Sequence, residues 1–206
     1  TFLNNGDQKM KGIEFEGNLA VTQNFSVRGT LGLLDAEYTD YCDIGLVGGL
    51  GPYAESIGNA VFDDTRASDC YTTNGNVAKE QPKVTGSISP SYRADLGDTG
   101  MRWNARADVR FESGQWREAA NIAKTSGFST VNLSAGLTGD NWGATLYINN
   151  ATDEDTPRKY ASGEDFMLIG GAGLGLAGPN ARYNDYNFRI TPRQERTLGV
   201  RLNYDF

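Results

Sequence analysis

The last twelve residues of the chain, from Glu195 to Phe206, constrain its fold more than any other stretch. Side chains of an extended strand point alternately to two faces, and apolar and polar residues alternate here with that period. The apolar face carries Leu198, Val200, Leu202, Tyr204 and Phe206. Such a strand fits two architectures: the last strand of a soluble β-sandwich, or the closing strand of a transmembrane β-barrel with interfacial aromatic residues.

The same alternation recurs along the chain. It predicts seven strands, at residues 9–21, 25–41, 81–96, 101–116, 128–138, 142–154 and 195–206. The clearest example runs from Met101 to Glu112, with one face wholly apolar and the other made of ionic and amide side chains. The phase blurs at Leu33 and Leu34, where we expect a bulge or an exit from lipid. Pro90 removes a ladder donor from its strand, so we expect a bulge or local irregularity there.

The connections between these strands alternate in length. Short turns at 22–24, 97–100 and 139–141 separate longer segments at 42–79, 117–127 and 152–193, which we expect to be loops. Outer-membrane barrels have short turns at one end and long loops at the other, whereas sandwiches do not sort their connections in this way. Trp103 and Trp142 follow short turns, where an interfacial aromatic girdle belongs. The pattern therefore predicts an all-β, antiparallel transmembrane β-barrel.

Composition argues against several function classes. The net charge of −7 disfavours a nucleic-acid binder, which needs a basic face. The absence of His and the presence of two Cys leave no thiol zinc site, and no nucleophile–base pair is apparent. We therefore expect no catalytic residue, no metal and no cofactor, and a protein that is not an enzyme. No apolar run approaches the roughly 18 residues of a membrane helix.

Four segments together carry a family resemblance. These are KGIEFEG at Lys11–Gly17, LLDAEYTDY at Leu33–Tyr41, INNATDED at Ile148–Asp155 and TPRQERTLGVRLNYDF at Thr191–Phe206. In this order they resemble the late barrel strands of the TonB-dependent receptors of Gram-negative outer membranes. The ending also resembles the assembly signal of outer-membrane barrels, carried by Leu202, Tyr204 and Phe206, although Gly199 lies two positions earlier than in the commonest form.

The resemblance implies a large barrel of 22 strands around a plug. Residues 1–206 would then be the C-terminal part of that barrel, about strands 16 to 22, and the plug and earlier strands would lie outside this chain. The expected function is energy-coupled uptake of a bulky nutrient, such as an iron–siderophore complex, across the bacterial outer membrane. The expected partners are membrane lipid, the remainder of the receptor, the inner-membrane protein TonB and a small-molecule substrate. The alternative is a structural or adhesive barrel, or a component of a larger surface assembly.

Two groups of residues are candidates for sites within such a receptor. The inward face of the barrel would carry Arg102, Arg106, Asp108, Arg110, Glu112 and Arg201. They would form either a wall of the ligand path that can contact an anionic substrate, or a structural ion-pair ladder with the plug and neighbouring strands. Cys42 and Cys70 lie in the first long loop and would form a disulfide in an oxidising compartment, with two free thiols as the alternative. The acidic side chains of that loop match no calcium-binding spacing. The G-x-G-x-x-G at 173–178 is followed by Pro179 and lacks the helix of a dinucleotide site.

Overall fold

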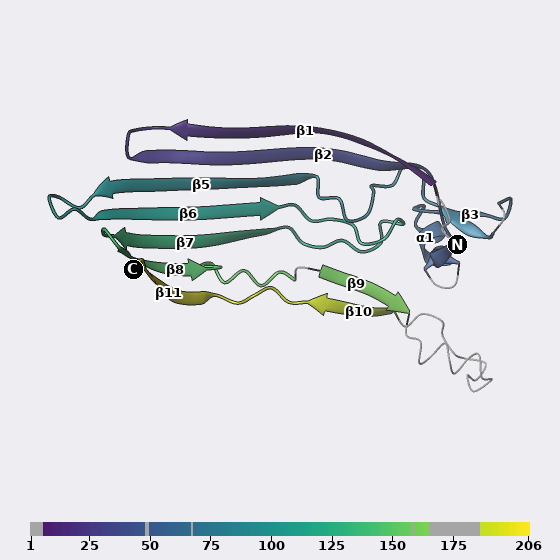
Figure 1. Ribbon diagram of the computed structural model, residues 1–206. Coiled ribbons are helices and arrows are strands. Elements are labelled where there is room, and N and C mark those ends of the chain that lie inside the picture. The colour runs from purple at the N-terminus through teal and green to yellow at the C-terminus, as the bar shows by residue number, and fades with distance from the viewer. Residues whose placement is uncertain (1–5, 48–49, 67, 158, 165–185) are drawn as a thin grey trace.

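The computed structural model describes residues 6–47, 50–66, 68–157, 159–164 and 186–206. Its principal element is an antiparallel meander of seven strands (Figure 1). They are β1 (Gly6–Ala20), β2 (Phe25–Asp43), β5 (Val84–Asp95), β6 (Arg102–Glu112), β7 (Phe128–Thr138), β8 (Trp142–Asn149) and β11 (Thr197–Tyr204). Each pairs with the next in this order, so the seven predicted strands are confirmed, with shorter ends for most of them.

The strand register keeps polar and apolar side chains on separate faces across the meander. Ala105, Ala135, Leu146 and Val200 lie side by side in one row. The adjacent row, on the opposite face, consists of Asn104, Gly136, Thr145 and Arg201. We call these the apolar face and the polar face. The alternation of the two faces is preserved from strand to strand because every connection at the short-turn end is a tight hairpin turn. Figure 1 shows all of these turns at the end of the meander that also holds the C-terminus.

The two expected irregularities have different outcomes. At Leu33 and Leu34 the expected bulge is wrong, because the β1–β2 register runs unbroken there and shifts only between Asp7 and Gln8. The blurred phase instead marks the point where β5 leaves β2, after which Leu34 packs against a buried cluster. At Pro90 the expected irregularity is confirmed: the β5–β6 ladder lacks pairs for two residues, and its register is the same on either side.

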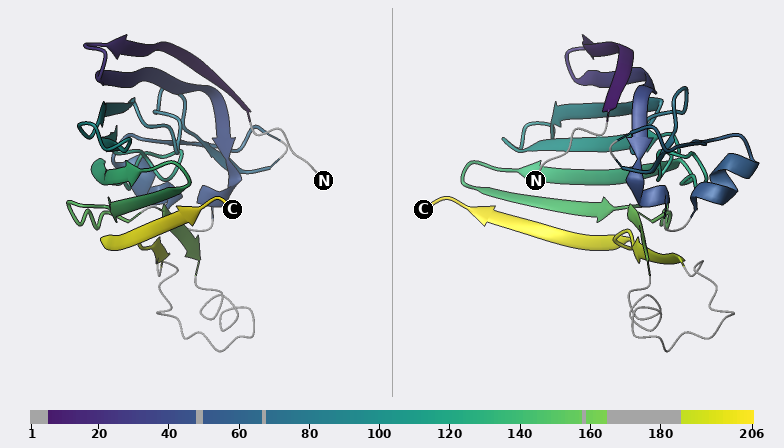
Figure 2. Two further views of the ribbon diagram at one scale, coloured as in Figure 1. Left: turned by 60° about the vertical axis from the view of Figure 1, so that its left-hand side comes forward. Right: turned by 90° about the vertical axis from the view of Figure 1, so that its right-hand side faces the viewer.

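The long-loop end contains more regular structure than the sequence predicted. The segment 42–79, expected to be a loop, holds a short 3₁₀ helix η1 (Ile44–Leu46), helix α1 (Gly51–Ser56) and strands β3 (Val61–Asp63) and β4 (Cys70–Thr72). Strand β4 pairs with both β3 and the far end of β2. Figure 2 shows these elements gathered beyond one end of the curved meander.

The segment 152–193 also differs from the expected loop, because it contains a hairpin of β9 (Lys159–Glu164) and β10 (Tyr186–Thr191). The glycine motif at 173–178 lies outside the described residues. No helix in the described ranges is both long enough and apolar enough to cross a membrane.

Candidate functional site

The charged side chains of β6 form pairs along their own strand. Arg106 donates from Nη2 to Asp108 Oδ1 at 2.5 Å, and the Ser89 hydroxyl of β5 donates to the same oxygen at 2.7 Å. Arg110 and Glu112 are more loosely paired, with 3.8 Å between Nη2 and Oε2. Solvent reaches most of these groups, so each pair contributes little to stability. Their main effect is to fix where charge lies on the polar face.

The other two arginines that were predicted to lie on the inward face are nearer the short turns. Arg102 begins β6, and Arg201 lies on β11 with its guanidinium 5.9 Å from the centre of the Tyr147 ring. Within the described part of the chain, neither arginine comes within 4.0 Å of a carboxylate. The six predicted residues therefore share one face but do not converge on one point.

A polar groove occupies the half of the polar face nearest the long loops. Its volume is about 640 Å³, and it runs from β5 to the start of β11. The charged residues that line it are Asp108, Arg110, Glu112, Arg193 and Glu195. The groove presents both signs of charge together with hydroxyl and amide groups. Its size and open shape suit the polar part of a bulky ligand.

Asn150 fixes the edge of this groove, and sequence reasoning did not single it out. The residue follows β8 with a φ of +50° and is only 6% exposed. Its backbone N–H donates to Asn132 Oδ1 at 2.9 Å, and its Nδ2 donates to the carbonyls of Glu154 and Gln194 at 2.9 and 3.0 Å. The Oδ1 atom accepts from the Glu154 N–H. One buried amide thus joins β7, β8 and the start of β11, and the only sequence signal was its place in INNATDED.

Arg193 and Glu154 extend this junction. The Arg193 guanidinium stacks 3.8 Å from the centre of the Phe128 ring and donates from Nε to the Thr156 carbonyl at 3.1 Å. The Glu154 carboxylate accepts from the backbone N–H groups of Thr156 and Ser129. Hydrogen bonds from Thr156 hold the pKa of Glu154 below its ordinary value. Both arms of the last long connection are therefore anchored to the start of β7.

The closing strand β11 pairs with β8 from Thr197 opposite Asn149 to Tyr204 opposite Trp142. The position of Gly199 has a steric reason: a Cβ atom there would lie 2.4 Å from the Tyr147 ring, which crosses β11 at this point. Phe206 follows the strand and meets the Tyr204 ring edge-on at 5.1 Å. No other described strand pairs with the far edge of β11.

The two tryptophans of the predicted girdle lie at the short-turn end of the meander. Trp103 pairs with Leu137 on the apolar face and lies 4.9 Å from the Tyr92 ring, measured between ring centres. Trp142 begins β8. An apolar face bordered by aromatic residues, opposite a charged face, is the arrangement that a membrane-spanning barrel wall requires.

Comparison with known proteins identifies the family. The family model described as TonB dependent receptor-like, beta-barrel, matches residues 1–151, which is more than half of the chain. The chain belongs to the TonB-dependent receptor family. The resemblance expected from the sequence is thereby confirmed. No curated protein sequence matches the chain.

Two solved structures share the receptor fold. The ferric yersiniabactin uptake receptor FyuA from Yersinia pestis matches with a TM-score of 0.65 and 14% identity, over 98% of this chain and 24% of that one. The siderophore receptor PiuA from Acinetobacter baumannii matches with a TM-score of 0.61 and 16% identity, over 97% of this chain and 22% of that one. The chain therefore spans about a quarter of the length of these receptors.

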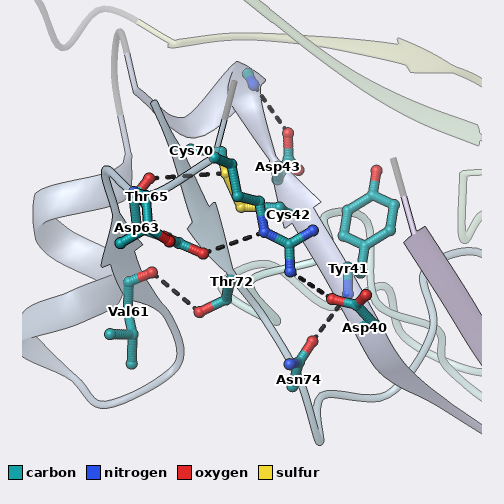
Figure 3. The surroundings of a disulfide bond; sticks show 12 residues. Asp40, Tyr41, Cys42, Asp43, Val61, Asp63, Thr65, Cys70, Thr72 and Asn74 are labelled. Atoms are coloured by element: carbon teal, nitrogen blue, oxygen red, sulfur yellow. Dashed lines mark hydrogen bonds and ion pairs between the residues drawn. A yellow bond between two sulfur atoms is a disulfide. The ribbon is translucent and has the colours of Figure 1, made fainter. Parts of the chain in front are cut away.

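In this receptor chain, the long-loop end is tied together by a disulfide between Cys42 and Cys70 (Figure 3). Their Cα atoms lie 5.5 Å apart, because the end of β2 and strand β4 are neighbours in one small sheet. The bond closes the segment that carries η1, α1 and β3 onto the meander.

Acidic residues beside the disulfide have partners of their own. Arg66 joins two of them, with Nη2 donating to Asp40 at 2.5 Å and Nε donating to Asp63 at 3.1 Å. Asp63 also accepts from the hydroxyl and N–H of Thr65, and these hydrogen bonds hold its pKa below the ordinary value. The acidic character of this loop is thus partly neutralised within it.

Two long connections pack together into a unit that we call the loop cap, residues 36–80 and 113–127. One cluster joins Leu46, Ala54, Ala60 and Tyr71 to Ala120, and a second joins Ala36, Tyr38 and Ala78 to Ala119. Asparagines fasten the two segments. Asn121 exchanges two hydrogen bonds with the backbone of Val77, and Asn76 donates to the carbonyl of Ala119 at 2.8 Å. Alternating patterns in the sequence gave no sign of this contact, because it joins residues more than forty positions apart.

Proposed function

We propose that this chain is part of the barrel wall of an outer-membrane receptor for energy-coupled uptake of a bulky nutrient, such as an iron–siderophore complex. In this proposal the apolar face meets membrane lipid, and the polar face lines the lumen. The groove beside Asn150 and the loop cap contribute to the binding of the substrate. The predicted ladder residues from Arg102 to Glu112, with Arg201, form part of the ligand path.

The observation that carries the proposal is the unbroken polar face, which crosses the meander and contains the groove directly next to the anchored long loops. A barrel that served only as a structural or adhesive element would need no groove of mixed charge on its inner wall. Family membership supports the outer-membrane location. The siderophore class is suggested by the two similar structures, a ferric yersiniabactin uptake receptor and a siderophore receptor.

The proposed partners follow from the size of the chain. It spans about a quarter of the similar receptors, so we propose that the remaining barrel strands and a plug belong to the same receptor outside residues 1–206. The far edges of β1 and β11 need strand partners, because unpaired backbone groups in lipid cost several kcal/mol each. TonB would supply the energy through the plug. The chain would form the C-terminal part of the barrel, with Leu202, Tyr204 and Phe206 as its assembly signal and Trp103 and Trp142 in its girdle.

Uptake by the full-length receptor tests the function. Cells with and without the receptor gene would be given ⁵⁵Fe bound to hydroxamate, catecholate or carboxylate siderophores. We expect that deletion of the gene abolishes accumulation of at least one chelate, and that a protonophore has the same effect. The Arg110→Glu change should lower accumulation several-fold, whereas Phe15→Leu on the apolar face should not. The proposal would be contradicted if the accumulation of every chelate were unaffected by deletion of the gene or by the protonophore.

Deletion of Phe206 tests the assembly signal separately. The shortened receptor should be synthesised normally but should reach the outer membrane in strongly reduced amounts, measured as the folded, heat-modifiable form. Normal amounts of folded receptor in the membrane would show that the terminal aromatic residue is not needed.

A further inference from the structure

The closing strand β11 reaches its partner β8 in a different way from the strands that follow short turns. Strand β8 ends at Asn149 and β11 begins at Thr197, so residues 150–196 connect them. In a tight hairpin the turn determines which residues stand opposite each other. A connection as long as this one imposes no single register by its own geometry. The register of β11 on β8 therefore depends on contacts that the two strands make.

The alternation of polar and apolar residues leaves this register open. A slip of one residue would turn the apolar side chains of β11 to the polar face, but a slip of two residues preserves both faces. Leu146 lies opposite Val200, and after such a slip it would lie opposite Leu198 or Leu202, which are equally apolar. Each slip would move the end of β11 by about 7 Å along β8. Another feature must therefore select one register among three.

Two glycines on the polar face supply such a feature. Gly199 of β11 stands directly opposite Tyr147 of β8, and a Cβ atom at Gly199 would lie 2.4 Å from the Tyr147 hydroxyl oxygen. Gly143 of β8 stands opposite Asn203 of β11, and a Cβ atom at Gly143 would lie 2.5 Å from Asn203 Oδ1. Each glycine thus leaves a hole that holds a side chain of the other strand. The two contacts run in opposite directions, one from each strand.

Slipped registers would lose both contacts. Tyr147 would then face Thr197 or Arg201, and either side chain would displace the ring from its position. Asn203 would leave the hole at Gly143, and in one of the two slips it would face Thr145. Overpacking at one pair and an unfilled hole at another both destabilise a structure. Only the observed register fills both holes.

The turn between β7 and β8 adds a contact at the end of β11. Asn141 Nδ2 donates to the Tyr204 hydroxyl at 3.0 Å, and the Asn141 carbonyl accepts from the Asp205 N–H at 2.9 Å. These groups are exposed and can bond to water instead, so the two hydrogen bonds favour the register only modestly. They hold the end of the strand at the place where the glycine contacts put it.

We propose that Gly143, Tyr147, Gly199 and Asn203 form a register lock, which selects the pairing of β11 on β8 and thereby the position at which the barrel closes. The edge of β8 fits a strand that carries Gly and Asn four residues apart, because its own Gly and Tyr have the same spacing. The four residues position the closing strand and have no part in substrate binding. This inference rests on the proposed function only in taking β11 as the strand that closes the barrel.

Disulfide crosslinking in the full-length receptor measures the register. Cysteine pairs on the apolar face leave the register lock intact. Leu146→Cys with Val200→Cys reports the observed register, and Leu146→Cys with Leu198→Cys or Leu202→Cys reports the two slipped registers. Outer membranes would be oxidised, and the crosslinked fraction of the folded receptor would be measured by mass spectrometry. We expect the first pair to give at least tenfold more crosslink than either of the others. Equal yields would overturn the proposal.

Filling one hole provides the matched comparison. Gly199→Thr should lower the yield of the Leu146→Cys, Val200→Cys pair at least threefold and raise the yield of a slipped pair, because the Tyr147 ring no longer fits. Thr145→Val changes the same face between the two contacts without filling a hole, and it should leave every yield within twofold of the parent. Unchanged yields in Gly199→Thr would overturn the register lock, since the anchors of the long connection would then suffice to set the register.

Exchange of the ring and the hole decides the matter if Gly199→Thr prevents assembly. The double variant Tyr147→Gly, Gly199→Tyr moves the ring to β11 and the hole to β8 within the same pair. Each single change should lower the amount of folded receptor with the observed crosslink at least threefold. The double variant should restore it to within about twofold of the parent. A double variant as impaired as the single ones would overturn the register lock, because the pair would not act through its fit.

Uptake measured in the same strains keeps the two proposals apart. A receptor that imports a chelate but keeps its register in Gly199→Thr would refute the register lock alone. A receptor whose register depends on the lock but which shows no energised import of any chelate would refute the proposed function alone.

Discussion

In the loop cap, side chains are buried against one another, whereas in the seven-stranded meander the large apolar side chains remain exposed. The buried hydrophobic residues among those described all lie in the cap, which includes the end of β2 from residue 36 to residue 43. Ala54, Ala119 and Ala120 are wholly inaccessible. The apolar face of the meander is open, with Leu202 75% exposed. The meander nevertheless has the longer strands and the more regular register.

The contrast reflects two different solvents. A segment in water gains stability by removing apolar surface from it, and the cap does so with two clusters and a disulfide. A barrel wall in lipid needs no such core, because its apolar side chains already match their surroundings. The backbone hydrogen bonds of the meander must all be made between strands. The cap therefore packs like a small water-soluble domain, whereas the meander has the exposed apolar face of a barrel wall in lipid.

Removal of the disulfide should produce the largest effect, and it should be confined to the cap. For a separation of 28 residues, the chain-entropy estimate is about 3–4 kcal/mol, so opening of the cap should become roughly a hundredfold or more easier in the variant Cys42→Ala, Cys70→Ala. Hydrogen exchange of the full-length receptor would measure this in residues 44–80. Exchange in β6 and β7 serves as the internal control. Equal acceleration in those strands would contradict the independence of the two regions.

Placement of a charge on the apolar face should have the next largest effect, and it should be confined to the meander. The change Val109→Arg is expected to cost about 2–4 kcal/mol if the site is near the middle of the bilayer. Thr130→Arg, on the polar face opposite Arg110, should cost less than about 1 kcal/mol, from like-charge repulsion alone. Reversible unfolding of the receptor in lipid vesicles provides the measurement. Equal costs at the two positions would contradict the assignment of the faces.

The contact between the two segments of the cap should be sensitive to Asn121. Its side chain bonds both backbone groups of Val77, and its φ is +51°. Asn121→Gly retains the backbone freedom but loses the hydrogen bonds, which should weaken the cap by about 1–3 kcal/mol. Asn121→Ala should weaken it further, because Ala is strained at positive φ. Hydrogen exchange in residues 113–127 would reveal the order, and a more stable Ala variant would contradict the role of the backbone conformation.

A small pH effect should also distinguish the cap from the meander. Burial raises the pKa of Glu118, whose carboxylate accepts from the Ala123 N–H and lies near Arg117 and Lys79. Because the folded cap holds this proton more tightly than the unfolded chain, the contribution to stability is greatest at low pH. It should decline as the pH rises from about 4.3 through the raised value. Glu118→Gln should remove that part of the pH dependence. The measurement is the rate of amide hydrogen exchange in the cap, corrected for the intrinsic pH dependence of exchange.

The accuracy of sequence-based prediction differed between the same two regions. Strict alternation located all seven strands, because each strand has one apolar and one polar face for most of its length. The method failed at Leu34, whose side chain turns into a buried cluster and breaks the pattern. It also failed for β3 and β4, which are three residues long and too short to show a period. The cysteines were the only sequence sign that the cap is ordered.

The candidate site was predicted in its composition but not in its arrangement. The charged residues of β6 were assigned to one face, and the register shows them there. The junction at Asn150 was missed, because its partners Asn132 and Gln194 lie on other strands and its importance comes from burial. The difference between paired and unpaired arginines was likewise invisible, since a salt bridge depends on the side chain that the neighbouring positions bring within reach.

The sequence by itself determined the strands, their two faces and the family, because period-two alternation and the spacing of turns are local properties of the chain. Tertiary structure alone decided how the two loop segments form one cap, where the polar face becomes a groove and which arginines remain unpaired. These features depend on contacts between residues far apart in the chain, such as Asn121 with Val77 or Arg193 with Phe128. Such contacts are set by strand register and packing, and they leave no periodic signal in the sequence.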